Sequence, residues 1–328
     1  MLIDKTAPLD TCNPNYSSKT ENLKLLIQLC WLIPSAVFQG KVIYVIAWKN
    51  REKFMKQSFF VIFLADCVTG FLLVSFSILF SRPIMFIPQI CIPISEFFTT
   101  HVFFLHLYYP LFRYLQAIQI LLQMFLITNR ASCVLWPMCY SNFWKKWLKW
   151  ALVFVLVLPF LGIWNVIISE KIVRHAYGGL FITYNRFVNW ARTSLFFVVL
   201  RGISIFIIIL STISTFWKMS KMRSKLMESE RKLCFASVFM SICFSIPAVM
   251  EFRYFQIRNE LTGSSIEYAL LLISWDIQNI SSTLILIVAS PPFRKFVLGN
   301  HEKPKSQKRS FATVGSQVIK VTSLSHIS

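Results

Sequence analysis

Long runs of hydrophobic residues alternate with short polar and basic segments along the chain. An α-helix needs about 20 mostly apolar residues to cross the hydrocarbon core of a bilayer. Seven stretches reach this length, whereas the strands of a membrane barrel would be about 10 residues long and alternate in polarity. The sequence therefore predicts an all-α membrane protein, a seven-transmembrane helix bundle over residues 24–290. The predicted spans are 24–48, 58–80, 105–127, 148–168, 193–217, 233–256 and 267–290.

The apolar segment 83–104 has two interpretations. It is hydrophobic enough for an eighth span, but it contains Pro83, Pro88 and Pro93, and prolines break helices. We interpret it as a long outer loop that lies against the membrane.

Composition narrows the function classes. Charged residues make up 15% of the chain, below the roughly 25% of soluble domains, and the 32 Phe and 10 Trp exclude a disordered chain. The net charge of +20 does not indicate a nucleic-acid partner, because the basic residues lie in clusters between apolar runs, which is typical of membrane loops.

Lys and Arg counts predict the orientation, because cytoplasmic loops carry an excess of both. With the N-terminus outside, the inner segments 49–57, 128–147, 218–232 and 291–328 hold 20 of them and the outer segments hold 8. Residues 1–23 are then an extracellular N-terminus. Pro291 and Pro292 end the last span, residues 293–298 are predicted to form a short amphipathic helix, and the cytoplasmic basic, Ser/Thr-rich tail 291–328 can bind anionic membrane lipid.

The predicted extracellular segments carry two modification signals. Asn15-Tyr16-Ser17 is an acceptor for N-glycosylation, which occurs on the lumenal side. Of the eight cysteines, Cys12 and Cys91 fall in outer segments, where disulfides form. We predict a Cys12–Cys91 bridge, and the alternative is two unpaired thiols.

Polar side chains within the third predicted span form a stripe. Gln116, Gln119, Gln123 and Arg130 share one helix face, with Arg113 beside it. Arg113 and Arg130 lie about 25 Å apart along a helix. This helix therefore predicts a polar site at each end, as a receptor needs for ligand and for coupling.

Ionisable side chains in other spans extend the outer site, since each one is costly in hydrocarbon. Arg113, Gln116, Arg201, Glu251 and Asp276 are predicted to line an outer cavity in which the arginines could bind an anionic ligand group. The alternative is that the arginines pair with Glu251 and Asp276 and hold the helices together.

Two more polar residues lie within spans. Asp66 lies midway along the second span, and Asn279 shares a face of the seventh with Asp276. Asp66 could hold a sodium ion or a water, or simply make a hydrogen bond between helices.

Catalytic and metal-binding motifs are missing from the sequence. It contains no HExxH, no G-x-S-x-G, no phosphate-binding loop, no dinucleotide fingerprint and no CxxC pair. We therefore expect no enzyme activity, no cofactor and no metal.

Several short stretches, in this order and spacing, resemble the nematode serpentine chemoreceptors, most closely the gamma class, over residues 24–298. They are Ser58-Phe59-Phe60 with Asp66; Arg82 with Ile87-Pro88-Gln89-Ile90-Cys91; Thr128-Asn129-Arg130 with Pro137 and Tyr140; Pro159-Phe160 with Trp164-Asn165, Gly178-Gly179 and Trp190-Ala191; and Glu230-Arg231-Lys232-Leu233-Cys234.

The resemblance implies a G-protein-coupled type of receptor for a small-molecule ligand, in the plasma membrane of sensory neurons and their cilia. Asn129-Arg130 stands where rhodopsin-type receptors have an acidic residue and Arg, so the resemblance implies a contact with a heterotrimeric G protein there. Asn129 replaces the acid, which puts an ionic lock in doubt. The alternatives are a ligand-gated channel subunit, a transporter, or a receptor-like partner in trafficking.

Overall fold

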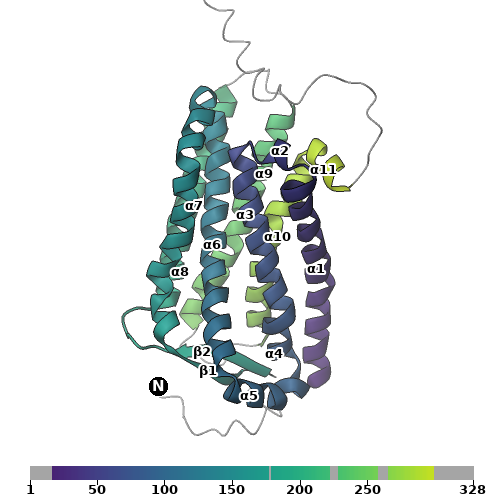
Figure 1. Ribbon diagram of the computed structural model, residues 1–328, viewed down its shortest axis with the longest axis vertical. Coiled ribbons are helices and arrows are strands. Elements are labelled where there is room, and N and C mark those ends of the chain that lie inside the picture. Colours follow the sequence, from purple (N-terminus) through teal and green to yellow (C-terminus); the bar gives the residue numbers. More distant parts are fainter. Residues whose placement is uncertain (1–16, 177–178, 222–227, 258–264, 299–328) are drawn as a thin grey trace, which may run out of the picture.

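Long helices occupy the positions of the predicted spans and run side by side along the long axis of the molecule (Figure 1). The computed structural model describes residues 17–176, 179–221, 228–257 and 265–298. Within them the long helices are α1 (Ser18–Tyr44), α3 (Ser58–Phe76), α6 (Val102–Leu135), α7 (Pro137–Ile168), α8 (Thr193–Lys221), α9 (Glu228–Ile257) and α10 (Ser265–Ala289).

Six of these helices are long and apolar enough to cross a membrane: α1, α3, α6, α7, α8 and α10. The 30-residue α9 stands at the sixth predicted span and packs between α8 and α10. Its interior Pro247, like Pro34, Pro110 and Pro159 in other helices, is compatible with transmembrane helices, where neighbouring groups can satisfy the freed carbonyl.

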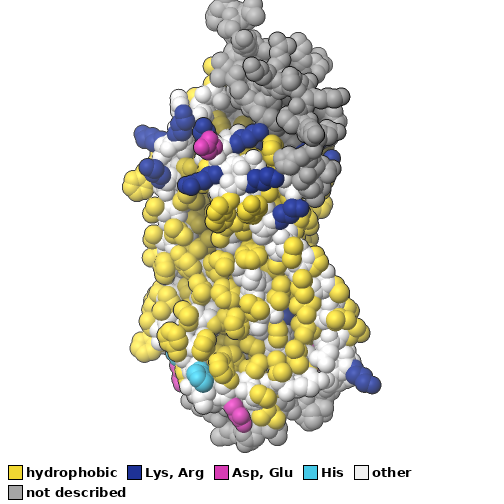
Figure 2. Space-filling view, turned by 45° about the vertical axis from the view of Figure 1, so that its right-hand side comes forward, with side chains coloured by type: hydrophobic (Ala, Val, Ile, Leu, Met, Phe, Trp, Pro, Cys, Tyr) yellow, Lys and Arg dark blue, Asp and Glu magenta, His cyan; other side chains and the backbone are white. Residues whose placement is uncertain are grey.

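The helix α6 lies at the centre of the bundle, and most of its surface is buried. It packs against α3, α7 and α8 and also contacts α9. The outward faces of the other helices are apolar, with exposed side chains such as Trp48, Phe206 and Val288. Figure 2 shows a broad hydrophobic face, crossed near one end by a row of Lys and Arg side chains. Such a surface fits lipid contact along the middle of the bundle.

The segment 83–104 folds into pieces that are too short to cross a bilayer. A π-helical turn, Ser77–Ser81, joins α3 to α4 (Arg82–Phe86), a 3₁₀ turn follows at Pro88–Ile90, and α5 spans Cys91–Thr100. The prediction of an outer loop in place of an eighth span agrees with these lengths.

The predicted inner segment 128–147 is helical except at one residue. The helix α6 continues to Leu135 and α7 begins at Pro137, so Trp136 alone separates them. Polar and basic residues can continue a helix outside the membrane. The end of an apolar run therefore marks where the chain leaves the membrane and does not mark where the helix ends.

A β-hairpin connects α7 to α8 in the otherwise helical bundle. β1 (Glu170–Ala176) pairs antiparallel with β2 (Gly179–Asn185), with Glu170 opposite Asn185 and Ala176 opposite Gly179. The sequence carries a signal for this pairing, because Gly178-Gly179 separates two runs rich in β-branched and aromatic residues. The hairpin packs on α4, and a Cβ on Gly179 would lie 2.4 Å from the carbonyl oxygens of Ile84 and Met85.

The two ends of the bundle differ in their short elements (Figure 1). We call the end with β1, β2 and α5 the hairpin end. We call the other the tail end; it carries α2 (Arg51–Phe54) and α11 (Pro291–Leu298). The predicted amphipathic helix at 293–298 is confirmed by α11, whose Phe293 packs against Phe54, Phe60 and Phe63.

Candidate functional site

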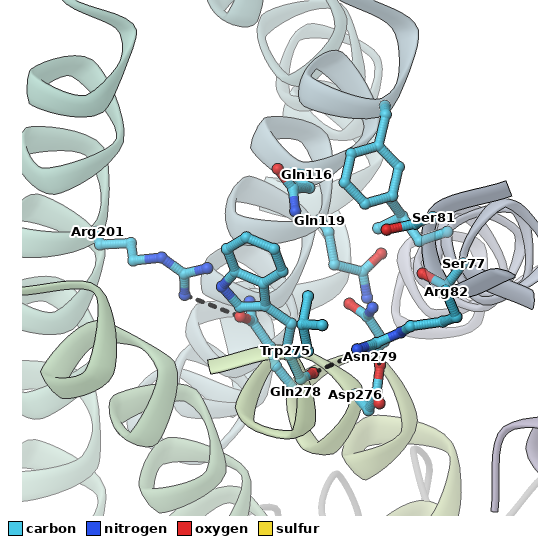
Figure 3. A pocket seen from close by; sticks show the side chains of 13 residues that line it. Ser77, Ser81, Arg82, Gln116, Gln119, Arg201, Trp275, Asp276, Gln278 and Asn279 are labelled. Atoms are coloured by element: carbon cyan, nitrogen blue, oxygen red, sulfur yellow. Dashed lines mark hydrogen bonds and ion pairs between the residues drawn. The ribbon is translucent and has the colours of Figure 1, made fainter. Parts of the chain in front are cut away.

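A polar cavity lies inside the hairpin half of the bundle, between α3, α4, α6, α8 and α10 (Figure 3). About 410 Å³ of space free of atoms lies among its lining residues, and part of that space is open to solvent. Arg201 reaches it from one side and Arg82 from the opposite side, with the side chains of α10 between them. The polar and aromatic residues that line it are Ser77, Ser81, Arg82, Phe112, Gln116, Gln119, Arg201, Trp275, Asp276, Gln278 and Asn279.

Arg82 and Asp276 form a buried ion pair across this cavity. Arg82 Nη2 lies 2.7 Å from Asp276 Oδ1 and also donates to the carbonyl of Leu272 at 3.3 Å. Trp31 Nε1 donates to Asp276 Oδ2 at 3.2 Å, so α1, α4 and α10 meet at this carboxylate. Charges buried in this way are stable only when paired, because desolvation penalises an isolated ion.

Arg82 is one of the eight Lys and Arg residues of the predicted outer segments, yet it lies inside the bundle. It is 1% exposed because the chain continues from α3 through the π-helical turn into α4 and keeps Arg82 within the bundle. One signal was available, since the predicted intramembrane Asp276 needed a cationic partner.

Arg201 forms a second ion pair, with Glu251, at 2.6 Å. Arg201 Nη1 also donates to Gln278 Oε1 at 2.8 Å, and Trp275 Nε1 donates to Glu251 Oε1 at 2.8 Å. The alternative interpretation was that the arginines pair with Glu251 and Asp276. Arg201 does pair with Glu251, whereas Asp276 pairs with Arg82, which was not among the predicted site residues. Glu251 does not line the cavity.

Arg113 lines a neighbouring cavity beneath the hairpin, where about 450 Å³ of space free of atoms, part of it open to solvent, lies among the lining residues. It donates to Gln116 Oε1 at 3.0 Å and to Tyr109 Oη at 3.3 Å, and its guanidinium lies 5.2 Å from the centre of the Tyr109 ring. Residues of the hairpin and aromatic side chains line this second cavity: Leu180, Phe181, Ile182, Tyr108, Tyr109, Phe112, Tyr268 and Trp275. Aromatic rings and one guanidinium group thus dominate the lining of this second cavity.

A layer of neutral amides and one carboxylate closes the polar cavity toward the middle of the bundle. Asp66, 1% exposed, accepts hydrogen bonds from Gln119 Nε2 at 2.8 Å and from the Ser282 hydroxyl. Gln278 Nε2 donates a hydrogen bond to Gln123 Oε1 at 3.0 Å. The glutamine stripe of α6 thus faces the bundle interior, and Asp66 serves in hydrogen bonds between helices.

Asn279 contributes in two ways. Its side chain borders the polar cavity, and its backbone carbonyl accepts a hydrogen bond from Gln39 Nε2 at 2.8 Å. Gly70 allows this close approach, because a Cβ there would lie 3.1 Å from the Asn279 carbonyl oxygen. Three helices, α1, α3 and α10, are joined at this point.

Asn129 and Arg130 lie at the tail end, away from both cavities. Asn129 is fully buried; its Nδ2 donates to Ser58 Oγ at 3.3 Å and its Oδ1 accepts from Tyr140 Oη at 2.9 Å. The Arg130 guanidinium lies 3.4 Å from the centre of the Phe59 ring. Asn129, which stands in place of an acidic residue, thus joins α3, α6 and α7 through neutral hydrogen bonds. The Arg130 guanidinium packs on the face of the Phe59 ring.

The predicted modification sites fall partly outside the described residues. Cys91 is disulfide-bonded, but Cys12 lies outside the described part of the chain, so the Cys12–Cys91 pair stays a prediction. Asn15 and residues 299–328 of the tail also lie outside the described part of the chain. Among the described residues, no group of three or more His, Cys, Asp or Glu could hold a metal ion.

Comparison with known proteins gives a consistent result. The family model described as "Srg family chemoreceptor" matches residues 25–297. The chain is 51% identical to serpentine receptor class gamma-1 of Caenorhabditis elegans over 288 residues, which is 87% of this chain and all of that one. It is 39% identical to serpentine receptor class gamma-2 of the same organism, covering 94% of each chain, and 41% identical to class gamma-9, covering 88% of this chain and 85% of the other.

Proposed function

Because the chain belongs to the Srg family of chemoreceptors, a family of multi-pass membrane receptors and not of enzymes, we propose that it binds a small-molecule ligand at the hairpin end and signals through a heterotrimeric G protein at the tail end. In this proposal it crosses the plasma membrane of a sensory neuron seven times, with the N-terminus outside. The observation that carries the proposal is the pair of cavities in the hairpin half, lined by polar and aromatic side chains.

The distribution of surface charge supports this orientation. At the tail end the exposed basic side chains include Lys49, Arg51, Lys56, Lys145 and Lys146. Cytoplasmic ends of membrane proteins carry such an excess of Lys and Arg. The hairpin end, which carries β1 and β2 over the second cavity, is then the end open to external chemicals.

The tail end supplies the chemistry for coupling. Arg130 is partly exposed and rests on Phe59, while Asn129 joins three helices by neutral hydrogen bonds. A ligand that binds one arrangement of the helices better shifts the receptor toward it. Separation of α3 and α7 from α6 at Asn129 would release Arg130 from Phe59 toward a G protein.

Second-messenger changes in cells that express the receptor test this function. We expect a ligand-evoked response in the unaltered protein and its loss in Arg130→Ala at equal surface expression. Arg186→Ala, an exposed arginine at the hairpin end, is the matched control and should respond normally. Equal responses of Arg130→Ala and the unaltered protein would remove Arg130 from the coupling mechanism.

A further inference from the structure

Positive charges outnumber negative charges around the two cavities, and this excess indicates the charge of the ligand of the proposed receptor. Three arginines and one carboxylate line the two cavities, namely Arg82, Arg113, Arg201 and Asp276, and a second carboxylate, Glu251, lines neither cavity but pairs with Arg201. Arg82 pairs with Asp276 and Arg201 with Glu251. Among the described residues Arg113 has hydrogen bonds to neutral groups only, so one positive charge is left over.

Arg82 carries donors that the protein does not use. Its Nη2 makes both hydrogen bonds of the side chain, whereas Nε and Nη1 are buried and have no hydrogen-bond acceptor among the described residues. A buried donor without an acceptor costs the full desolvation of that group. An acceptor brought by a ligand into the polar cavity would remove this cost.

The two cavities adjoin one another at the residues that precede these two arginines. Ser81 and Phe112 line both cavities, as does Trp275. Ser81 precedes Arg82 at the start of α4, and Phe112 precedes Arg113 on α6. The excess charge and the unused donors therefore flank one shared boundary.

The second cavity has the character of a site for an apolar group. The strand β2 covers it with Leu180 and Ile182, and its aromatic rings come from Tyr108, Tyr109, Phe112, Phe181, Tyr268 and Trp275. Aromatic rings could also receive a cation, but Arg113 lies 6.0 Å from the centre of the Trp275 ring and 5.2 Å from that of Tyr109 and would repel it.

We propose that the ligand is a small amphipathic monoanion. Its acid group binds at the boundary between Arg82 and Arg113, and its apolar part lies among the aromatic rings beneath the hairpin. A single negative charge matches Arg113, which has no carboxylate partner within hydrogen-bond distance among the described residues. The acid can be a carboxylate or a singly charged sulfur or phosphorus acid, since each accepts hydrogen bonds from guanidinium.

The thermal unfolding midpoint of the purified full-length receptor measures this binding. The probes are octanoate and octanesulfonate as anions, methyl octanoate as the neutral analogue and octylamine as the cation. We expect the anions to raise the midpoint and the other two to leave it unchanged. The stronger of the two anions identifies the class of acid. Equal stabilisation by the ester or the amine, or no stabilisation by either anion, would overturn the proposal.

Variants locate the acid group. Arg113→Gln should bind the anions about tenfold to a hundredfold more weakly, the loss expected for one charge-assisted hydrogen bond. Arg253→Gln removes an exposed arginine of α9 and should bind them normally. Because Arg113→Gln also loses the hydrogen bonds to Gln116 and Tyr109, the effect of each anion is measured against the midpoint of the same variant without ligand. Full anion binding by Arg113→Gln would contradict the assignment.

Arg82→Gln alone would leave Asp276 unpaired, so the test uses Arg82→Gln together with Asp276→Asn. This double variant removes both charges together, keeps the size of the Asp276 side chain and shortens that of Arg82, and it should lose anion binding to a similar degree. Unchanged anion binding by the folded double variant would remove Arg82 from the proposed site.

The proposal rests on the proposed function, yet the two can fail separately. A G-protein response to the neutral ester that is equal to the response to octanoate would overturn the anion proposal and leave the receptor function intact. Stabilisation by the anions that depends on Arg113, with no second-messenger response to any agonist, would support the anion site and count against the receptor function.

Discussion

At the hairpin end four charged side chains join four helices through ion pairs, whereas at the tail end a network of neutral side chains joins three helices. Arg82, Arg201, Asp276 and Glu251 form two ion pairs around a cavity. Asn129 and its partners Ser58 and Tyr140 form a network of hydrogen bonds beside an aromatic cluster.

The difference indicates what each end can do. Ion pairs in a low dielectric are sensitive to a further charge, so a ligand at the hairpin end can alter the balance of forces between helices. Neutral hydrogen bonds cost about 1 kcal/mol each to separate, so the tail end can open without unpairing a charge. A receptor needs one end that responds to the charge of a ligand and another end whose helices separate at low cost in free energy, and the two ends of this bundle have these properties.

The largest expected effect comes from removing one partner of an ion pair at the hairpin end. Arg82→Ala leaves the Asp276 carboxylate buried without its cation and should destabilise the protein by about 3–5 kcal/mol. Thermal unfolding of the purified protein and the amount at the cell surface measure this. The double variant Arg82→Ala with Asp276→Ala should recover part of the loss, and no recovery would show that the pairing is not the cause.

A smaller effect is expected where the hairpin meets α4. The Cβ of Gly179→Ala would lie 2.4 Å from two backbone carbonyl oxygens, so the hairpin must move, at a cost of about 3 kcal/mol. Ligand binding at the cavity beneath should weaken at the same time. Gly202→Ala is the control, because nothing lies within 4 Å of its added Cβ. Equal binding by both variants would separate the hairpin from the ligand site.

At the tail end, Asn129→Ala should cost about 2 kcal/mol, since the Tyr140 and Ser58 hydroxyls each lose a partner. Basal second-messenger output should rise, because α3, α6 and α7 then separate more easily. Tyr140→Phe removes one of these bonds and should give a smaller increase. A fall in basal output for Asn129→Ala at normal surface expression would contradict this role of the network.

The smallest effect concerns the aromatic contact of Arg130. Phe59→Leu removes the ring beneath the guanidinium and should lower stability by about 1 kcal/mol beyond the change in packing, while raising basal signalling. Phe60→Leu is the matched control, because Phe60 contacts Phe54, Phe59 and Phe293 in the same cluster. Identical basal signalling in the two variants would exclude a specific effect of Phe59 on Arg130.

Much of this architecture follows from the sequence, since seven apolar runs at helical length specify the long helices. Local patterns did not reveal the continuation of α6 to Leu135, because hydropathy marks the membrane and not the helix end. They also placed Arg82 in a loop, since its burial depends on a helical turn between α3 and α4 and on Asp276, almost 200 residues away. Which arginine pairs with which acid is a property of packing between helices, and no single helix encodes it.

The account depends on the hairpin end facing the exterior. Epitope tags at the N-terminus and the C-terminus, probed with antibody on intact and on permeabilised cells, test this directly. We predict that the N-terminal tag is detected on intact cells and the C-terminal tag only after permeabilisation. Detection of the C-terminal tag on intact cells, or of the N-terminal tag only after permeabilisation, would contradict the account.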